Sequence, residues 1–185
     1  MRTRTVGQSP LLLLDVIEVL RSEDIEYAVV GALAAAVYGT IRASADADAL
    51  VSLGIARLTA LSRVLKRENF AVELRRGDAG DPIPAMLVIS DRHGNRVDLL
   101  GGLRGLDPQV LARTVEIPFS GETIRVVSCE DFIAMKCFAG GPQDLQDARV
   151  ALKTSDETFD VDLLRRVTRR FGRGAADALE VLLAS

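Results

Sequence analysis

The chain contains few of the residues on which several common protein classes depend. Among its 185 residues there are two cysteines, no tryptophan and a single histidine, His93. Cys129 and Cys137 fall in one expected helix without a companion pattern of metal ligands, which excludes a disulfide framework and indicates a reducing, cytoplasmic setting. His93 lies in a tight turn, which favours a structural role over a catalytic one.

Long apolar runs are also missing, and no run approaches the roughly 18 residues that a membrane-spanning helix needs. The apolar stretch at 11–14 is too short for a signal peptide, and the chain shows no internal repeat or low-complexity linker. With 26 acidic against 23 basic residues the net charge is -3, which argues against a general nucleic-acid binder. The 48% hydrophobic content predicts a compact soluble protein.

Hydrophobic periodicity predicts an α+β protein, with an α/β core over residues 1–127 and a C-terminal helical region over 128–185 packed on that core. Ser9 is expected to cap the first helix and Ser128 the first helix of the C-terminal region. Residues 75–84 are expected to form a loop or flap. Strands are expected at 27–30, 46–51, 70–74, 85–90, 96–100, 114–119 and 122–127, and helices at 10–21, 32–38, 55–68, 109–113, 129–139, 143–152, 160–171 and 174–183.

Two aspartates one residue apart, Asp46 and Asp48, open the second expected strand. Residues two apart on a strand point to the same side, so both carboxylates face one way and repel each other unless something positive lies between them. A hard divalent cation such as Mg²⁺ meets that need, because it binds carboxylates together with substrate phosphates. The alternative is a turn with two solvated acids.

A glycine stands upstream of these acids, where the first expected strand runs into the short helix 32–38. Gly31 precedes this helix and Ala32 begins it, and the backbone N–H groups at this point would be available to an anion. A phosphate site joined to a metal site by so short a segment indicates a clamp for a magnesium nucleotide. Arg42 lies between the two and either reaches a phosphate or is a solvated loop residue.

A third acid, Asp98, lies inside an otherwise apolar strand, where a carboxylate is unfavourable without a partner. If this strand neighbours the strand of Asp46 and Asp48, the three acids can hold two metal ions for phosphoryl or nucleotidyl transfer. Asp98 can then also accept the proton of the attacking hydroxyl. Alternatively, Asp98 lies on a wet face or pairs with an arginine such as Arg96.

Gly31 with its short helix, the pair Asp46 and Asp48, and the later strand acid Asp98 together resemble the polymerase-beta-like nucleotidyltransferase superfamily. That family has a glycine followed by glycine or serine, a helix, Asp-x-Asp or Asp-x-Glu, and a third acid on a following strand. The resemblance implies a mixed β-sheet flanked by helices, an NTP donor, and two Mg²⁺ ions (or Mn²⁺) held by the three acids.

The helical segment from Glu130 to Ala148 resembles one group within this superfamily. It is similar to the Leu-x-x-Lys and Lys/Arg-Asp-x-x-Asp segment of the abortive-infection (AbiEii-type toxin) nucleotidyltransferases. This similarity implies that Lys136 contacts nucleotide phosphates and that Asp144 is a further residue of the site. From the residues alone, Lys136 could equally be a lysine that extends from a helix edge into solvent.

Three positions depart from the family pattern. Ala32 replaces the glycine or serine that follows Gly31, Ala45 replaces the threonine before the paired acids, and Gln143 replaces the basic residue before Asp144. These departures leave open a degenerate member that binds nucleotide poorly or not at all.

The leading functional hypothesis is therefore an enzyme that moves an NMP from an NTP to a hydroxyl of an RNA or tRNA end, a protein or a small molecule. It could be a toxin with a cognate antitoxin as its partner. The alternatives are a non-catalytic protein that binds a partner through its helical tail, and a phosphohydrolase that uses the same acids. A basic helix face is either solvated or binds an RNA end or an acidic partner, and it consists of Arg165, Arg166, Arg169, Arg170 and Arg173.

Overall fold

The computed structural model describes residues 1–184, and the chain divides into two compact units. The first comprises Met1–Leu33 and Ala43–Arg104, and the second comprises Ala34–Arg42 and the chain from Gly105 onward. The short helix α2 (Gly31–Val37) crosses the division between them. The domain boundary expected after Val127 falls inside the second unit and stays a prediction.

Five strands of the first unit pair side by side in the order β3-β4-β5-β2-β1. β2 and β5 run parallel, whereas the other neighbouring strands are antiparallel. The sheet is therefore mixed, as the sequence resemblance implied. The strands are Ala28–Val30 (β1), Asp46–Leu50 (β2), Ala71–Arg76 (β3), Ala85–Ser90 (β4) and Arg96–Leu100 (β5).

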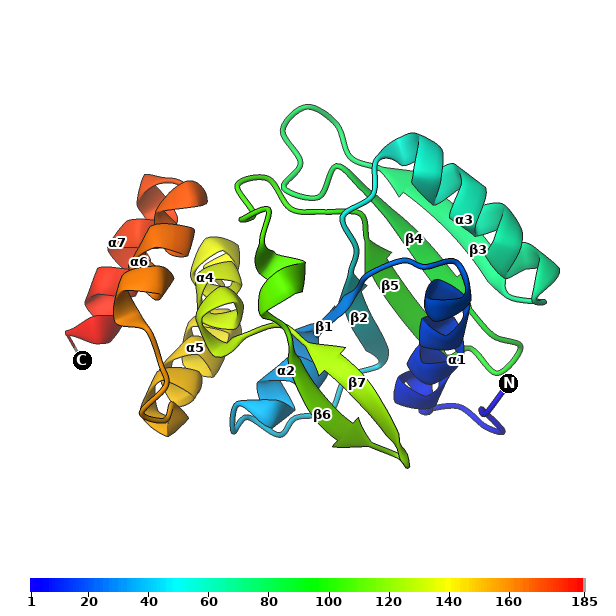
Figure 1. The fold of residues 1–185 in the computed structure, drawn as a ribbon, viewed down its shortest axis with the longest axis horizontal. Helices are drawn as coiled ribbons and strands as arrows, with labels where there is room; N and C mark the ends of the chain where they lie inside the picture. The colour runs from blue at the N-terminus through cyan, green and yellow to red at the C-terminus, as the bar shows by residue number, and fades with distance from the viewer. Residues whose placement is uncertain (185) are drawn as a thin grey trace. The chain divides into compact units, whose positions relative to one another are not determined.

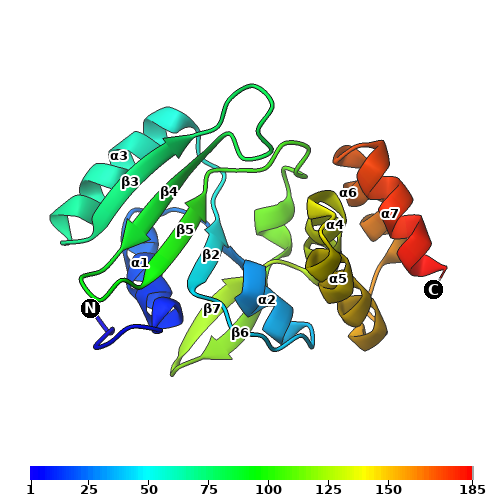
Figure 2. The same cartoon turned by 180° about the vertical axis from the view of Figure 1, so that it is seen from behind.

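Helices α1 (Ser9–Ser22) and α3 (Ile55–Arg67) cover one face of these strands, as Figures 1 and 2 show from opposite sides. α1 packs on β2 and β5, and α3 packs on β3 and β4. Alternate residues of β2 and β5 are fully buried on the helix side, and burying such apolar area contributes about 25 cal/mol per Å². These buried residues are Ala47, Ala49, Val97 and Leu99. The side chains between them point to the opposite face, because side chains alternate along a strand.

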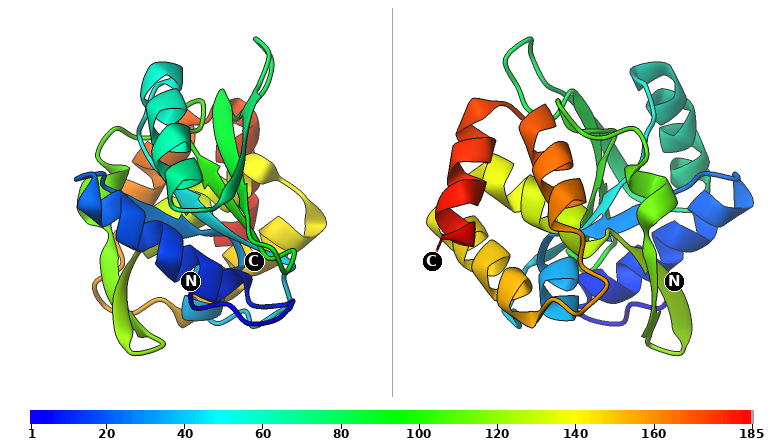
Figure 3. Two further views of the ribbon diagram at one scale, coloured as in Figure 1. Left: turned by 90° about the vertical axis from the view of Figure 1, so that its right-hand side faces the viewer. Right: turned by 60° about the vertical axis from the view of Figure 1, so that its left-hand side comes forward.

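The second unit contains a hairpin followed by four helices. A 3-10 turn η1 (Val110–Arg113) leads into the hairpin of β6 (Val115–Phe119) and β7 (Glu122–Val126). α4 packs against each of the three helices that follow it, which Figure 3 shows in yellow to red. Its central place explains why residues on several sides of it are buried. The four helices are α4 (Cys129–Ala139), α5 (Pro142–Thr154), α6 (Val161–Arg170) and α7 (Arg173–Leu183).

The structure confirms the α+β class with C-terminal helices, and most expected elements lie within a few residues of their predicted limits. Ser128 caps α4, because its Oγ accepts a hydrogen bond from the Asp131 N–H at 3.2 Å. The predicted cap at Ser9 is wrong, since α1 already includes this residue and its hydroxyl bonds elsewhere. The predicted loop at 75–84 begins later, since β3 continues to Arg76. Within residues 1–184, no helix combines the length and apolar character needed to cross a membrane.

Candidate active site

Gly31 stands at the junction of β1 and α2, where the backbone takes a left-handed conformation with φ of +64°. A Cβ atom at this position would lie 2.0 Å from Oδ2 of Asp48, well inside van der Waals contact. Glycine is therefore needed for two reasons: the backbone conformation, and the close approach of the Asp48 carboxylate. The predicted link between Gly31 and the paired acids is thus a direct contact within the first unit.

The three predicted acids lie on one face of the first unit's sheet. The parallel pairing of β2 and β5 aligns Asp48 with Asp98 and Asp46 with Arg96, and residues aligned on neighbouring strands share a face. Neighbouring strands lie about 4.8 Å apart, so Asp48 and Asp98 are near neighbours. The buried alanines Ala47 and Ala49 alternate with the acids of β2 and face α1, so the acids project from the opposite face. Asp46 also accepts a hydrogen bond from the Ser44 hydroxyl at 2.9 Å.

Arg96 binds Asp98 through both arms of its guanidinium group. Nε donates to Oδ1 at 2.7 Å and a terminal nitrogen donates to Oδ2 at 2.6 Å, while Asp98 is only 8% exposed. The hydrogen bonds to Asp98, together with the charges of Asp46 and Asp48, raise the pKa of Arg96. The pairing of Asp98 with Arg96, one of the two alternatives left open from the sequence, is therefore present.

Ser9 connects the two acid-bearing strands and was not predicted to do so. Its buried hydroxyl donates to the carbonyl of Ala45 at 2.7 Å and accepts from the backbone N–H of Arg96 at 3.0 Å. It thus joins the residue before Asp46 to the first residue of β5. Only the tertiary structure places Ser9 there, since 36 residues separate it from Ala45 and 87 from Arg96.

The donor set on this face suits Mg²⁺ by its chemistry, because all three ligands would be hard carboxylate oxygens. Asp46 and Asp48 are half-buried and lie on the same side of β2. The face does not hold a ready-made cage, since the structure of residues 1–184 shows no group of three or more His, Cys, Asp or Glu residues arranged to hold a metal. Both oxygens of Asp98 already accept hydrogen bonds from Arg96, so Asp98 would join a metal site only after rearrangement.

Lys136 lies on α4 of the second unit and does not extend into solvent. It is 8% exposed, and its Nζ lies 2.7 Å from Asp144 and 3.0 Å from Asp147 on α5. The same nitrogen lies 5.6 Å from the centre of the Phe132 ring. The alternative that Lys136 extends into solvent is therefore wrong. Lys136 and Asp144, which were both predicted to belong to the site, lie next to each other.

Asp147 is the second aspartate of the Asp-x-x-Asp segment that begins at Asp144, and its place beside Lys136 was not predicted. It is completely buried, and its Oδ2 lies within ion-pair distance of Lys136 and 3.6 Å from Nε of Arg42, without hydrogen-bond geometry to either. Gln143 donates to its other oxygen at 2.9 Å. The spacing of three residues from Asp144 on one helix is the signal that could have identified Asp147.

The two remaining predicted site residues are placed as follows. Ala32 is half-buried in the first turn of α2, within the first unit, and offers no side-chain hydroxyl. Arg42 belongs to the second unit, where the buried Asp147 is its ion-pair partner, so Arg42 is not simply a solvated loop residue.

The basic face of α6 and its neighbourhood is partly neutralised by acids of the second unit. Arg165 pairs with Glu180 at 2.9 Å, Arg170 lies 3.6 Å from Asp107, and Arg173 lies 3.6 Å from Asp177. Exposed pairs of this kind contribute little energy and do not prevent an arginine from binding another group.

The histidine and cysteines lie where a structural role is expected. The His93 N–H donates to Asp91 at 2.8 Å in the turn between β4 and β5. Both cysteines are free thiols. Burial raises the pKa of Cys129 to about 12, with the nearby acids Glu130 and Asp156 adding to the effect, and burial raises that of Cys137 to about 11. Thiols with such pKa values remain protonated and weakly nucleophilic at neutral pH.

Several proteins of known structure have a similar fold. No family model and no curated protein sequence matches the chain. The solution structure of the antibiotic-resistance factor ANT(2'')-Ia is similar with a TM-score of 0.59 and 13% identity, over 94% of this chain and 96% of that one. The crystal structure of ANT(2'')-Ia with adenylyl-2''-tobramycin gives a TM-score of 0.58 and 12% identity, over 87% and 95%.

A third similar structure is the lincosamide antibiotic adenylyltransferase LnuA with bound lincomycin, at a TM-score of 0.50 and 12% identity, over 83% of this chain and 100% of that one. At such low identity the likeness concerns the fold and not the substrate. The mixed sheet, the helices on one of its faces and the C-terminal helices thus make this chain a protein of the nucleotidyltransferase fold.

Proposed function

We propose that the protein is a Mg²⁺-dependent nucleotidyltransferase that moves an NMP from an NTP to a hydroxyl acceptor. The observation that carries the proposal is the parallel register of β2 and β5, which puts Asp46, Asp48 and Asp98 on one face of the sheet. The contact between Gly31 and Asp48 supports it, since it joins the glycine motif to the acids. A structural role alone gives no reason to gather three carboxylates on this face.

Each acid has a separate proposed task. Asp46 and Asp48 would hold the cation, and Asp98 would complete the site and accept the proton of the acceptor hydroxyl. The new bond joins the acceptor oxygen to the α-phosphorus, the bond from that phosphorus to pyrophosphate breaks, and pyrophosphate leaves. Bound Mg²⁺ would supply charge neutralisation for the triphosphate and polarise the attacking oxygen.

The family resemblance supports a set of nucleotide-binding residues in this chain. Gly31 and Ala32 would offer backbone N–H groups to the triphosphate, with no hydroxyl contribution from Ala32. Lys136, Asp144 and Arg42 all belong to the second unit, where Lys136 and Arg42 carry the positive charge that a triphosphate needs. Lys136 would have to exchange part of its contact with Asp144 and Asp147 for a phosphate oxygen.

The acceptor is proposed to be a small polyhydroxylated molecule, a protein hydroxyl or the end of an RNA. The adenylyl-tobramycin and lincomycin in two structures of similar fold support the first class. A toxin of the AbiEii type with a cognate antitoxin is the other setting that the motif around Lys136 and Asp144 favours. The proposed location is the cytoplasm, where NTPs are available and free thiols stay reduced.

A second candidate function is a non-catalytic protein that retains the fold and binds a partner. Ala32 and Gln143 favour it, and so does the ion pairing that already occupies Lys136 and Asp98. Under this hypothesis, replacement of Asp48 by Asn leaves the biological effect intact. Under the transferase hypothesis the same replacement abolishes the effect.

Calorimetric titration of MgATP, MgCTP, MgGTP and MgUTP into the protein tests the leading proposal. We expect one nucleotide to bind in the micromolar to millimolar range, about -8 to -4 kcal/mol, only with Mg²⁺ present. The Asp46→Asn/Asp48→Asn variant should lose this binding, whereas Asp162→Asn/Asp177→Asn, which removes the same charge from exposed positions of the second unit, should keep it. Equal binding by both variants would exclude the acids as the nucleotide site.

A further inference from the structure

Arg96 and Asp98 form a charged pair on β5, with 2.6 Å between a terminal guanidinium nitrogen and Oδ2. They are two residues apart on β5, so both side chains project from the same face. Across the parallel pair, Arg96 is aligned with Asp46 and Asp98 with Asp48. β2 and β5 therefore present three carboxylates and one guanidinium group on this face.

The two hydrogen bonds between these residues engage both Asp98 oxygens, at 2.7 and 2.6 Å. A fork of this kind is charge-assisted and fixes the plane of the carboxylate. The side chain of Asp98 is 11% exposed, so water has little access to the oxygens that Arg96 engages. Any cation that took Asp98 as a ligand would have to compete with the guanidinium group.

Ser9 fixes the backbone on which this pair stands. Its hydroxyl accepts from the Arg96 N–H and donates to Ala45, so the first residue of β5 is tied to the residue before Asp46. Arg96 is thereby held beside the acids at its backbone as well as at its side chain.

We propose that Arg96 is a positioning residue that controls access to Asp98, so that a divalent cation gains the third carboxylate only when Arg96 gives up at least one of its two hydrogen bonds. The inference rests on the proposed function, because it takes the three acids to be metal ligands. It has a consequence of its own: the protein without nucleotide binds divalent cations weakly, and removal of the Arg96 side-chain charge strengthens that binding.

The chain supplies a matched control for Arg96 on the neighbouring part of the sheet. Arg75 on β3 forms a similar bidentate pair with Glu73, because its guanidinium group donates to both carboxylate oxygens, at 3.0 and 3.1 Å. The registers of β3 with β4 and of β4 with β5 align Glu73 with Val88 and Val88 with Asp98, so the Arg75 pair shares the face of the acids. Arg75→Gln therefore removes one positive charge from the same face without releasing Asp98.

Manganese binding to the nucleotide-free protein tests the proposal, with free Mn²⁺ counted by electron paramagnetic resonance. We expect Arg96→Gln to bind Mn²⁺ about tenfold more tightly than the unmodified protein, which corresponds to about 1.4 kcal/mol. Arg75→Gln should change the affinity less than about twofold, because the half-exposed Arg75 side chain donates its hydrogen bonds to Glu73 and its charge is screened by solvent. An equal gain in both variants, or no gain in Arg96→Gln, would overturn the proposal.

A double-mutant cycle isolates the part of the effect that acts through Asp98. In an Asp98→Asn background, Arg96→Gln should alter Mn²⁺ affinity by less than about twofold, whereas a persistent tenfold gain would mean that Arg96 acts by general repulsion. If Arg96→Gln fails to fold, as judged by circular dichroism, Arg96→Lys keeps the charge, loses the fork and should give a smaller gain of about threefold. No gain in Arg96→Lys would then overturn the proposal.

These results are separable from the test of the proposed function. Magnesium-dependent nucleotide binding with unchanged Mn²⁺ affinity in Arg96→Gln leaves the transferase standing and removes the role of Arg96. Tighter Mn²⁺ binding in Arg96→Gln without any nucleotide binding supports control of a metal site by Arg96 and removes the NTP as the substrate.

Discussion

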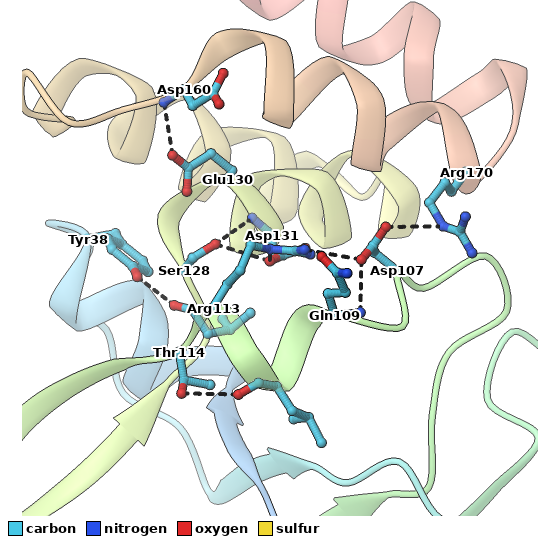
Figure 4. A network of polar contacts seen from close by, with 12 residues as sticks. Tyr38, Asp107, Gln109, Arg113, Thr114, Ser128, Glu130, Asp131, Asp160 and Arg170 are labelled. Carbon is cyan, nitrogen blue, oxygen red and sulfur yellow. Dashed lines mark hydrogen bonds and ion pairs between the residues drawn. The ribbon is translucent and has the colours of Figure 1, made fainter.

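Carboxylates in the two units are compensated in different ways. On β2 and β5 of the first unit, three carboxylates share one face with a single guanidinium group from the same two strands, that of Arg96. In the second unit, Asp107 and Asp131 are matched by two guanidinium groups, Arg113 and Arg170 (Figure 4). β2 and β5 themselves thus carry three carboxylates to one guanidinium group, whereas the network of the second unit has two of each.

The balanced network in the second unit joins segments that are distant in the chain. Arg113 donates to both oxygens of Asp131 at 2.8 Å and to Asp107 at 3.1 Å, and Arg170 lies 3.6 Å from Asp107. η1, α4 and α6 are thereby connected, as Figure 4 shows. The comparison indicates that the second network holds the structure together, whereas the carboxylates gathered on β2 and β5 are suited to a cation that arrives from solution.

The largest expected effect concerns the balanced network. Arg113→Met should reduce the free energy of unfolding by about 3–4 kcal/mol, because it leaves the carboxylate of Asp131, 2% exposed, without its main partner. The melting temperature should fall by roughly 6–12 °C. As the control, Arg165→Met removes an arginine of the exposed pair with Glu180 and should leave the melting temperature unchanged. Similar melting temperatures for both variants would contradict the structural role of the network.

The next effect concerns the contact between the glycine motif and the acids. Gly31→Ala should cost about 2–3 kcal/mol of stability, since a side chain adds left-handed backbone strain and a collision with Asp48. Gly94→Ala is the matched control, because Gly94 also has a positive φ, +82°, but a Cβ there meets no atom within 4 Å. The difference in unfolding free energy between the two variants, measured in urea, isolates the collision with Asp48. Equal costs would mean that the contact is absent in solution.

Much of the acid-bearing face could be predicted from the sequence, because the alternation of side chains on a strand places Asp46 and Asp48 on one side. The register that aligns Asp48 with Asp98 could not, since a parallel pairing joins segments about 50 residues apart and depends on the whole unit. Arg96 was considered as a partner of Asp98 because the two stand at strand spacing. Which alternative holds depends on the burial of Asp98, and burial is a tertiary property.

The second unit shows the same limit for helices. The cap of α4 at Ser128 follows from local hydrogen bonding and was predicted correctly. The burial of Lys136 was not, because it depends on α5 bringing Asp144 and Asp147 against α4. The misassigned cap at Ser9 has the same origin. A local pattern suggested a cap, but the hydroxyl instead bonds to two segments from other parts of the chain.

The smallest expected change in stability concerns Asp46. Asp46→Asn removes one of three like charges, so we expect the free energy of unfolding to stay within about 0.5 kcal/mol of its original value while nucleotide binding is lost. Asp91→Asn is the contrasting variant, because Asp91 is buried and accepts hydrogen bonds from the backbone N–H groups of His93 and Asn95 at 2.8 and 3.0 Å. It should cost about 1–2 kcal/mol.

Acid titration sharpens this last contrast. Burial alone would raise the pKa of Asp91, but hydrogen bonds from the Asn95 side chain and from the backbone N–H groups of His93 and Asn95 outweigh it and hold the pKa below its usual range. A carboxyl with a lowered folded-state pKa contributes stability that is present above its unfolded-state pKa of about 3.9 and is lost as the pH falls through the folded-state value. Asp91→Asn should therefore show its full cost near neutral pH and converge with the unmodified protein only as the pH falls through the lowered pKa of Asp91, as measured by unfolding free energies across acid pH. If Asp46→Asn instead destabilised the protein at neutral pH as strongly as Asp91→Asn, the acids on the sheet face would be structural, and the distinction between the two regions would fail.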